Sequence, residues 1–180
     1  VMSKRACGGS AANTVISLSQ FGGKGFLSCK VADDENGQFY MQDLIDNGVD
    51  YNADAQISQG ITGKCLVMIT DDADRTMNTF LGISSELATT DIDASAIKNS
   101  EYLYIEGYLV TGESSLNAVL EACDIARQAG TKIALSLSDP GIVEYFRDAL
   151  KSIVGDGVDL LFCNEQEALS WCQTDDLDRA

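Results

Sequence analysis

YLYIEGYLVTGESSLNAVLEACDIARQAGTKIALSL, residues 102–137, carries the pattern from which the fold class of this chain is predicted. Tyr102–Ile105 is a short apolar run typical of a buried strand, and Ser114–Gln128 repeats apolar residues at helical spacing before Gly130. Lys132–Leu137 is a second strand-like run. A strand, a helix and another strand in this order form a parallel pair covered by the helix. The stretch therefore predicts an α/β fold.

The same alternation continues on both sides of this stretch. Toward the C-terminus, the pattern predicts one helix from Pro140 through Ile153, a strand over 160–163 and a further helix over 165–171. Toward the N-terminus, it predicts a helix over 11–21, a strand over 26–31, and a helix capped by Asp33 or Asp34 and closed by Gly48. The repeated order indicates a mainly parallel sheet whose faces are covered by helices.

Residues 49–83 differ in character from the rest of the chain. Two β-rich segments, 65–70 and 76–81, flank the polar segment Asp71-Asp72-Ala73-Asp74-Arg75. Strand, turn and strand in close succession are typical of a hairpin. We therefore expect a small antiparallel excursion from the parallel sheet in this region.

Composition excludes several classes of function. The 180 residues carry 12 basic and 28 acidic side chains, a formal charge of −16, which argues against nucleic acid as a partner. No apolar run approaches the length of a membrane span, so no membrane partner is expected. The chain has no histidine, which excludes Ser-His-Asp and Cys-His catalysis on it. Its six cysteines form no C-x-x-C pair, a usage that favours reduced thiols and a cytoplasmic protein.

The strongest local signal is Gly8-Gly9-Ser10-Ala11-Ala12-Asn13, which opens directly into the first predicted helix. Glycine permits close approach of a ligand to the backbone, and the helix start offers free N–H groups. The Asn13 amide adds a donor and an acceptor for hydroxyl groups. The alternative is a plain glycine turn with Asn13 on an exposed face.

Several segments together resemble the ribokinase/PfkB family of carbohydrate kinases. The resemblance lies in Gly8–Thr14 and Gly22, in Lys30–Gly37, in Thr62–Cys65 with Asp74–Gly82, in Leu137-Ser138-Asp139-Pro140, and in the N-x-x-E motif Asn164-Glu165-Gln166-Glu167. The segments at 62–82 and 137–140 resemble the adenosine-kinase-like branch. The motifs follow one another in the family's order over nearly the whole chain.

The resemblance implies a ribokinase-like three-layer αβα sandwich with a mainly parallel sheet and a small β lid. We expect one such domain over residues 1–180, with the lid excursion in 49–83 and with the fold incomplete at both termini. The family's catalytic base is expected C-terminal to Ala180, so no residue of this chain is predicted to be the base.

By the same resemblance, Gly8, Gly9 and Asn13 would contact hydroxyl groups of the substrate. Arg75, expected in the lid turn, would bind a phosphate or a ring hydroxyl, and a solvated turn arginine is the alternative. Glu106, at the end of a strand, would accept from a substrate hydroxyl, and a surface or capping role is the alternative.

Asn164 and Glu167 would lie near the phosphates of ATP and help to hold Mg²⁺, with Glu167 acting through water. The implied reaction is transfer of the γ-phosphoryl group of ATP to a hydroxyl group of a sugar. The alternatives are a nucleoside (adenosine) kinase and a catalytically inactive sugar-binding or regulatory module. A homodimer formed through the lid is a further expectation.

Overall fold

The structure, a computed structural model, describes residues 5–52 and 58–180. Residues 1–4 and 53–57 lie outside this description, and the second gap falls within the predicted lid range 49–83. The chain divides into two compact units, Val1–Leu87 and Ala88–Ala180, and each is described by itself. One domain spanning residues 1–180 stays a prediction.

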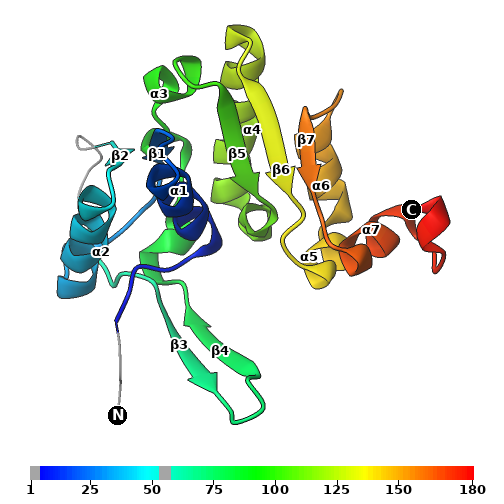
Figure 1. Ribbon diagram of the computed structural model, residues 1–180. Helices are drawn as coiled ribbons and strands as arrows, with labels where there is room; N and C mark the ends of the chain where they lie inside the picture. Colours follow the sequence, from blue (N-terminus) through cyan, green and yellow to red (C-terminus); the bar gives the residue numbers. More distant parts are fainter. Residues whose placement is uncertain (1–4, 53–57) are drawn as a thin grey trace. The chain divides into compact units, whose positions relative to one another are not determined.

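The first unit begins with two helix–strand pairs: α1 (Ser10–Gln20), β1 (Gly25–Leu27), α2 (Glu35–Asp46) and β2 (Val49–Tyr51) (Figure 1). The two strands are parallel, with Gly25 opposite Val49 and Leu27 opposite Tyr51. Their small core consists of Ala12, Val15, Leu27, Leu44 and Val49. The α/β order predicted for this region is confirmed.

One predicted strand is too long. The run over 26–31 was expected to be extended throughout, but β1 ends at Leu27. Within the described residues, its ladder with β2 ends at the pair Leu27 and Tyr51. Among the described residues, Ala32 then forms an isolated parallel bridge with Ser58.

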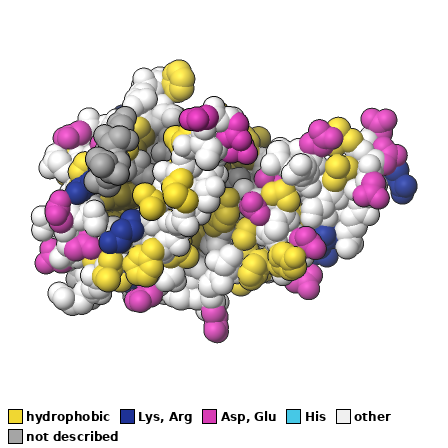
Figure 2. Space-filling model, turned by 90° about the horizontal axis from the view of Figure 1, so that it is seen from below, with side chains coloured by type: hydrophobic (Ala, Val, Ile, Leu, Met, Phe, Trp, Pro, Cys, Tyr) yellow, Lys and Arg dark blue, Asp and Glu magenta, His cyan; other side chains and the backbone are white. Residues whose placement is uncertain are grey.

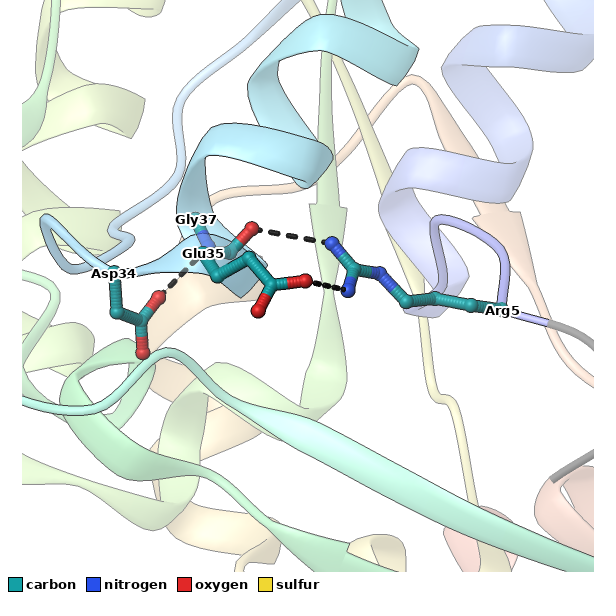
Figure 3. A network of polar contacts seen from close by, with 4 residues as sticks. All are labelled: Arg5, Asp34, Glu35 and Gly37. Atoms are coloured by element: carbon teal, nitrogen blue, oxygen red, sulfur yellow. Dashed lines mark hydrogen bonds and ion pairs between the residues drawn. The ribbon is translucent and has the colours of Figure 1, made fainter. Parts of the chain in front are cut away.

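Helix α2 is capped by Asp34 rather than by Asp33. The Asp34 Oδ1 atom accepts hydrogen bonds from the Gly37 N–H at 2.8 Å (Figure 3) and from the Thr62 hydroxyl at 2.6 Å. Its Oδ2 atom accepts from the Thr62 N–H at 3.0 Å. The Thr62 hydroxyl oxygen in turn accepts from the Ala32 N–H at 2.9 Å. One carboxylate therefore ties the start of α2 to the base of the hairpin.

These hydrogen bonds make stability depend on acidity. The Thr62 hydroxyl and N–H lower the pKa of Asp34 from 3.8 to about 2. Because the folded-state pKa lies below the unfolded one, the stabilisation is complete above pH 3.8 and is lost as the pH falls toward 2. We expect Asp34→Asn to lower the melting temperature at pH 6, and the difference from the unchanged protein to shrink between pH 4 and pH 2. Thermal unfolding followed by circular dichroism checks this, and a difference independent of pH would contradict it.

The rest of the first unit contains the hairpin of β3 (Lys64–Ile69) and β4 (Arg75–Phe80), then the 3₁₀ helix η1 (Gly82–Glu86). The strands are antiparallel, as the sequence predicts, and Ile69 lies opposite Arg75. Every residue of both strands is exposed, although several are large and apolar. Among the described residues of this unit, nothing covers either face of the hairpin.

The second unit is built on three parallel strands in the order β5–β6–β7: β5 (Tyr102–Glu106), β6 (Lys132–Ser136) and β7 (Leu160–Phe162). Figure 1 shows them side by side with α4 (Glu113–Ala129) against the sheet. Gly130 ends α4 in the left-handed conformation, with φ 78°. The remaining elements are η2 (Thr89–Asp91), α3 (Ala94–Lys98), η3 (Gly107–Thr111), α5 (Pro140–Tyr145), α6 (Arg147–Val154), α7 (Glu165–Cys172) and η4 (Leu177–Arg179).

The helix predicted from Pro140 through Ile153 is two helices. Phe146, with φ −121° and ψ 24°, leaves the helical conformation between α5 and α6. Val143, Leu150 and Ile153 are nevertheless all fully buried in the same core cluster. The apolar spacing therefore looks continuous, and periodicity alone does not reveal a break at one residue.

The surface carries the acidic excess. On the face shown in Figure 2, Asp and Glu side chains are dispersed, and Lys and Arg form no continuous patch there. All six cysteines are free. In the part of the chain that the structure describes, no helix is both long and apolar enough to cross a membrane.

Candidate functional site

The glycine turn at the start of α1 has an open backbone. Gly9 is the N-cap of α1 with φ 96°, and no side chain caps the helix. A Cβ added at Gly8 or Gly9 would meet nothing within 4 Å. Asn13 is exposed on the first turn, and its N–H donates to the Gly9 carbonyl at 3.0 Å. The helix start thus has no side-chain cap and Asn13 is exposed, which fits a plain glycine turn as well as a ligand site, so substrate contact by these residues stays a prediction.

Two residues, Arg5 and Cys7, hold this turn against α2. Arg5 forms an ion pair with the Glu35 carboxylate at 2.8 Å, donates to the Glu35 carbonyl at 3.1 Å (Figure 3), and lies 4.1 Å from the centre of the Phe39 ring. The Cys7 N–H donates to the Asp43 carboxylate at 3.1 Å. Burial, with a smaller contribution from Asp43, raises the pKa of the Cys7 thiol to about 11, so this thiol is a poor nucleophile at neutral pH. The turn therefore has a fixed position on α2.

Arg75 does not lie in the hairpin turn. It is the first residue of β4, where it pairs with Ile69, and the turn consists of residues 70–74. The turn is closed by hydrogen bonds between Thr70 and Asp74 and within 70–73, with Ala73 at φ 66°. Both strands thus begin and end one residue earlier than expected, and Arg75 passes from the turn into β4. The Arg75 side chain is exposed on the strand.

In the second unit, Glu106 ends β5 and is only 8% exposed. Its Oε2 atom accepts from the Ser138 hydroxyl at 3.2 Å. Its Oε1 atom is buried and has no hydrogen-bond partner among the described residues. A buried carboxylate oxygen without a donor is costly, because it loses water and gains nothing in return. A donor from outside the described residues, such as a ligand hydroxyl or a water, would satisfy this atom.

The ends of the neighbouring strands add polar groups to the same edge of the sheet. Because β5, β6 and β7 are parallel and adjacent, the residues that follow them gather at one edge. Burial raises the pKa of the Tyr108 hydroxyl, and the charges of Asp139, Glu106 and Glu167 raise it further. The three carboxylates therefore act on one hydroxyl group at this edge. Asp139, interpreted from sequence as a turn residue, caps α5 through the Gly141 N–H at 2.7 Å.

Asn164 and Glu167 form reciprocal hydrogen bonds at the start of α7. Glu167 is 5% exposed, and its two oxygens accept from the Asn164 N–H at 3.1 Å and from the Asn164 side-chain amide at 2.9 Å. The Asn164 Oδ1 atom accepts from the Glu167 N–H at 2.8 Å. This is a complete capping box.

The same geometry limits how Mg²⁺ could bind here. Each Glu167 oxygen already accepts one hydrogen bond, and no group of three or more acidic, Cys or His side chains in the described residues could hold a metal ion. Mg²⁺ keeps several waters and needs few carboxylates. The residues therefore fit contact with Mg²⁺ through water.

A model of the pfkB family carbohydrate kinases matches residues 3–180. The chain belongs to the pfkB carbohydrate kinase family. It is 32% identical over 134 residues to the 5-dehydro-2-deoxygluconokinase of Geobacillus kaustophilus, covering 72% of this chain and 40% of that protein. It is 30% identical over 142 residues to fructokinase-1 of Zea mays, covering 78% of this chain and 43% of the relative. The chain thus spans less than half the length of these pfkB relatives.

Solved structures give the fold. The adenosine kinase of Sinorhizobium meliloti superposes with a TM-score of 0.90 at 35% identity, over 97% of this chain and 54% of that one. A ribokinase II from E. coli, solved in complex with ATP and Mg²⁺, superposes with a TM-score of 0.84 at 18% identity, over 99% of this chain and 60% of that one. This pfkB chain therefore has the ribokinase-like α/β fold that the sequence predicts, with parallel sheets and an antiparallel hairpin.

The contacts of two residues in this pfkB chain, Arg5 and Ser138, were not predicted from the sequence. Arg5 contacts a residue 30 positions away, and Ser138 contacts Glu106 from 32 positions away. Neither pairing leaves a periodic or spaced signal in the sequence.

Proposed function

We propose that this protein is an ATP-dependent kinase that transfers the γ-phosphoryl group to a hydroxyl group of a sugar. The buried, unpartnered Glu106 Oε1 at the end of β5 carries the proposal, since it calls for a ligand with a hydrogen-bond donor. Membership of a family whose named relatives are kinases supplies the reaction class.

The residues of this chain would position the reactants. Gly8, Gly9 and Asn13 would bind substrate hydroxyls, Glu106 would accept from another hydroxyl, and Arg75 would contact the substrate from the hairpin. Phosphoryl transfer depends mainly on such positioning and on neutralising charge. No residue of this chain is proposed as the catalytic base.

The nucleotide side of the proposed site lies at the start of α7. ATP and Mg²⁺ are proposed because a structure of the same fold is described in complex with both. Mg²⁺ would neutralise charge on the phosphates, and Asn164 with Glu167 would contact its water ligands. Cytoplasmic location stays a prediction, supported by the free thiols.

A nucleoside such as adenosine is the alternative acceptor. The observation in its favour is the structural likeness to a protein described as an adenosine kinase, at 35% identity. A catalytically inactive sugar-binding or regulatory module is the second alternative, because the proposed substrate-binding residues Gly8, Gly9 and Asn13 can bind a sugar without transfer of a phosphoryl group.

A homodimer through the hairpin is proposed as well. The support is the exposure of both hairpin faces with the apolar side chains of Leu66, Val67, Met68, Ile69 and Met77. Exposed apolar patches of this kind are typical of interaction surfaces.

Turnover by the protein expressed from the full gene tests the function. ATP consumption is measured with a panel of sugars and nucleosides for the unchanged protein, for Asn13→Ala, and for Asn117→Ala as a matched control on the exposed face of α4. We expect activity on one acceptor class, a loss of about 100-fold in kcat/KM in Asn13→Ala, and no change in the control. Saturable sugar binding without turnover would favour the inactive module. If the protein showed no turnover and bound none of the sugars or nucleosides, the proposal would be overturned.

The proposed magnesium contact has its own test. In Glu167→Gln the amide retains one acceptor oxygen for the Asn164 cap but loses the negative charge. We expect the Mg²⁺ concentration for half-maximal activity to rise about tenfold, with a melting temperature within a few degrees of the unchanged protein. An unchanged Mg²⁺ dependence would leave Glu167 with the capping role alone.

A further inference from the structure

Ser138 lies two residues after β6 and forms hydrogen bonds with the end of β5, with Tyr108 and with Ser136 of β6. Its hydroxyl oxygen accepts from the Gly107 N–H at 2.8 Å and lies 3.2 Å from Glu106 Oε2. The Ser138 N–H donates to the Ser136 hydroxyl at 3.2 Å, and the Ser138 carbonyl accepts from the Tyr108 hydroxyl at 3.0 Å. Both the backbone and the side chain of Ser138 are therefore engaged.

The single hydroxyl proton of Ser138 has two acceptors within reach. These are Glu106 Oε2 at 3.2 Å and the Ser136 carbonyl at 3.3 Å. A charged acceptor forms the stronger hydrogen bond, so the proton goes to the carboxylate. Since the hydroxyl oxygen is held by the Gly107 N–H, the carboxylate is fixed through Oε2, and Oε1 is the oxygen left over.

The backbone around Ser138 supports this placement. Ser138 has φ 71°, a conformation that residues other than Gly, Asn and Asp rarely adopt. A Cβ at Gly107 would lie 2.8 Å from the carbonyl oxygens of Ser136 and Leu137, so the ends of β5 and β6 approach as closely as glycine allows. This approach brings the Ser138 hydroxyl to Glu106.

We propose that Ser138 is a positioning residue that holds the Glu106 carboxylate so that Oε1 faces a hydroxyl group of the acceptor substrate. The inference rests on the proposed function and deepens it. Ser138 is not expected to touch the substrate, and it acts through Glu106.

Ser138→Gly isolates this role. Glycine adopts φ 71° without strain, so the variant removes the hydroxyl group and leaves the backbone conformation accessible. Ser136→Ala is the matched control, because the Ser136 hydroxyl supports the same loop by accepting the Ser138 N–H but makes no hydrogen bond with Glu106 among the described residues.

The experiment is a double-mutant cycle on the protein from the full gene, with Ser138→Gly and Glu106→Gln singly and combined. The acceptor is the sugar or nucleoside on which the unchanged protein is active. We expect Ser138→Gly to raise KM for the acceptor about tenfold with KM for ATP unchanged, and to have less than a twofold effect when Glu106→Gln is already present. Ser136→Ala is expected to act independently of Glu106→Gln.

Additive effects of the two substitutions, or equal changes in both KM values, would overturn the proposal and leave Ser138 with a structural role. Absence of turnover in the unchanged protein would instead overturn the proposed function. In that case the same four proteins are compared by calorimetric titration with each sugar and nucleoside of the panel. Coupling between the two substitutions in Kd supports the positioning role without catalysis, and its absence or a lack of any binding overturns it.

Discussion

Replacing Gly37 by alanine is expected to lower the free energy of unfolding by about 3 kcal/mol, although alanine is the better helix former. Gly37 lies in the first turn of α2, where a Cβ would be 2.0 Å from the Ala32 carbonyl oxygen and 2.9 Å from the Thr62 hydroxyl. The gain in helix propensity is about 1 kcal/mol. The contact with a backbone oxygen cannot be relieved by a rotamer change, so the chain must move.

The movement would also break the cap. The Gly37 N–H donates to Asp34, and Thr62 shares the same carboxylate, so a shift of residue 37 disturbs the whole connection between α2 and the hairpin base. At about 2–4 °C per kcal/mol, the melting temperature should fall by roughly 6–12 °C. The control is Gly8→Ala, where a Cβ meets nothing within 4 Å and no loss of stability is expected. Equal melting temperatures for Gly37→Ala and the unchanged protein would show that this close approach is absent.

Replacing Glu106 by glutamine is expected to lower kcat/KM for the acceptor by about 100-fold without lowering the melting temperature. The two effects have one cause. In the free protein, Oε1 is buried without a donor, and a buried charge that is only partly paired costs stability. The neutral amide removes the buried charge and still accepts from Ser138 through its oxygen.

A ligand-binding role and a structural role predict opposite outcomes for this variant. If Glu106 serves only the fold, Glu106→Gln should lower the melting temperature and leave kcat/KM nearly unchanged. If it serves the ligand, activity falls while stability is kept or increases. Thermal unfolding and acceptor kinetics on the same preparation separate the two cases.

The order of helices and strands was predictable because burial imposes a period on the sequence. The α/β order of both units and the Asn164 start of α7 follow from apolar spacing and capping residues. The ends of elements were less predictable, because they depend on partners distant in sequence. β1 stops where β2 stops, and the break at Phe146 does not alter which side chains are buried.

Candidate site residues were predictable where a local sequence feature marks the position. Asn13 and Glu106 follow a glycine turn and a strand, two features that are visible in sequence. Ser138 was not predictable, because its role depends on a left-handed backbone at a non-glycine residue and on a contact across two strands. The same holds for Arg5, whose partner Glu35 meets it only after α2 has folded.

The exposed hairpin also bears on the order in which the chain folds. Its strands pair residues as close as Ile69 and Arg75, whereas the parallel strands pair Tyr102 with Lys132 across an intervening helix. Local pairs close quickly, on the order of microseconds, and distant pairs form later. The strands of the hairpin contribute no buried side chain. Its early formation therefore provides no apolar core against which later helices and strands can pack. The rate-limiting step should instead be docking of α4 on β5 and β6, and in a monomer the hairpin should be the first segment to exchange its amide protons in the native state.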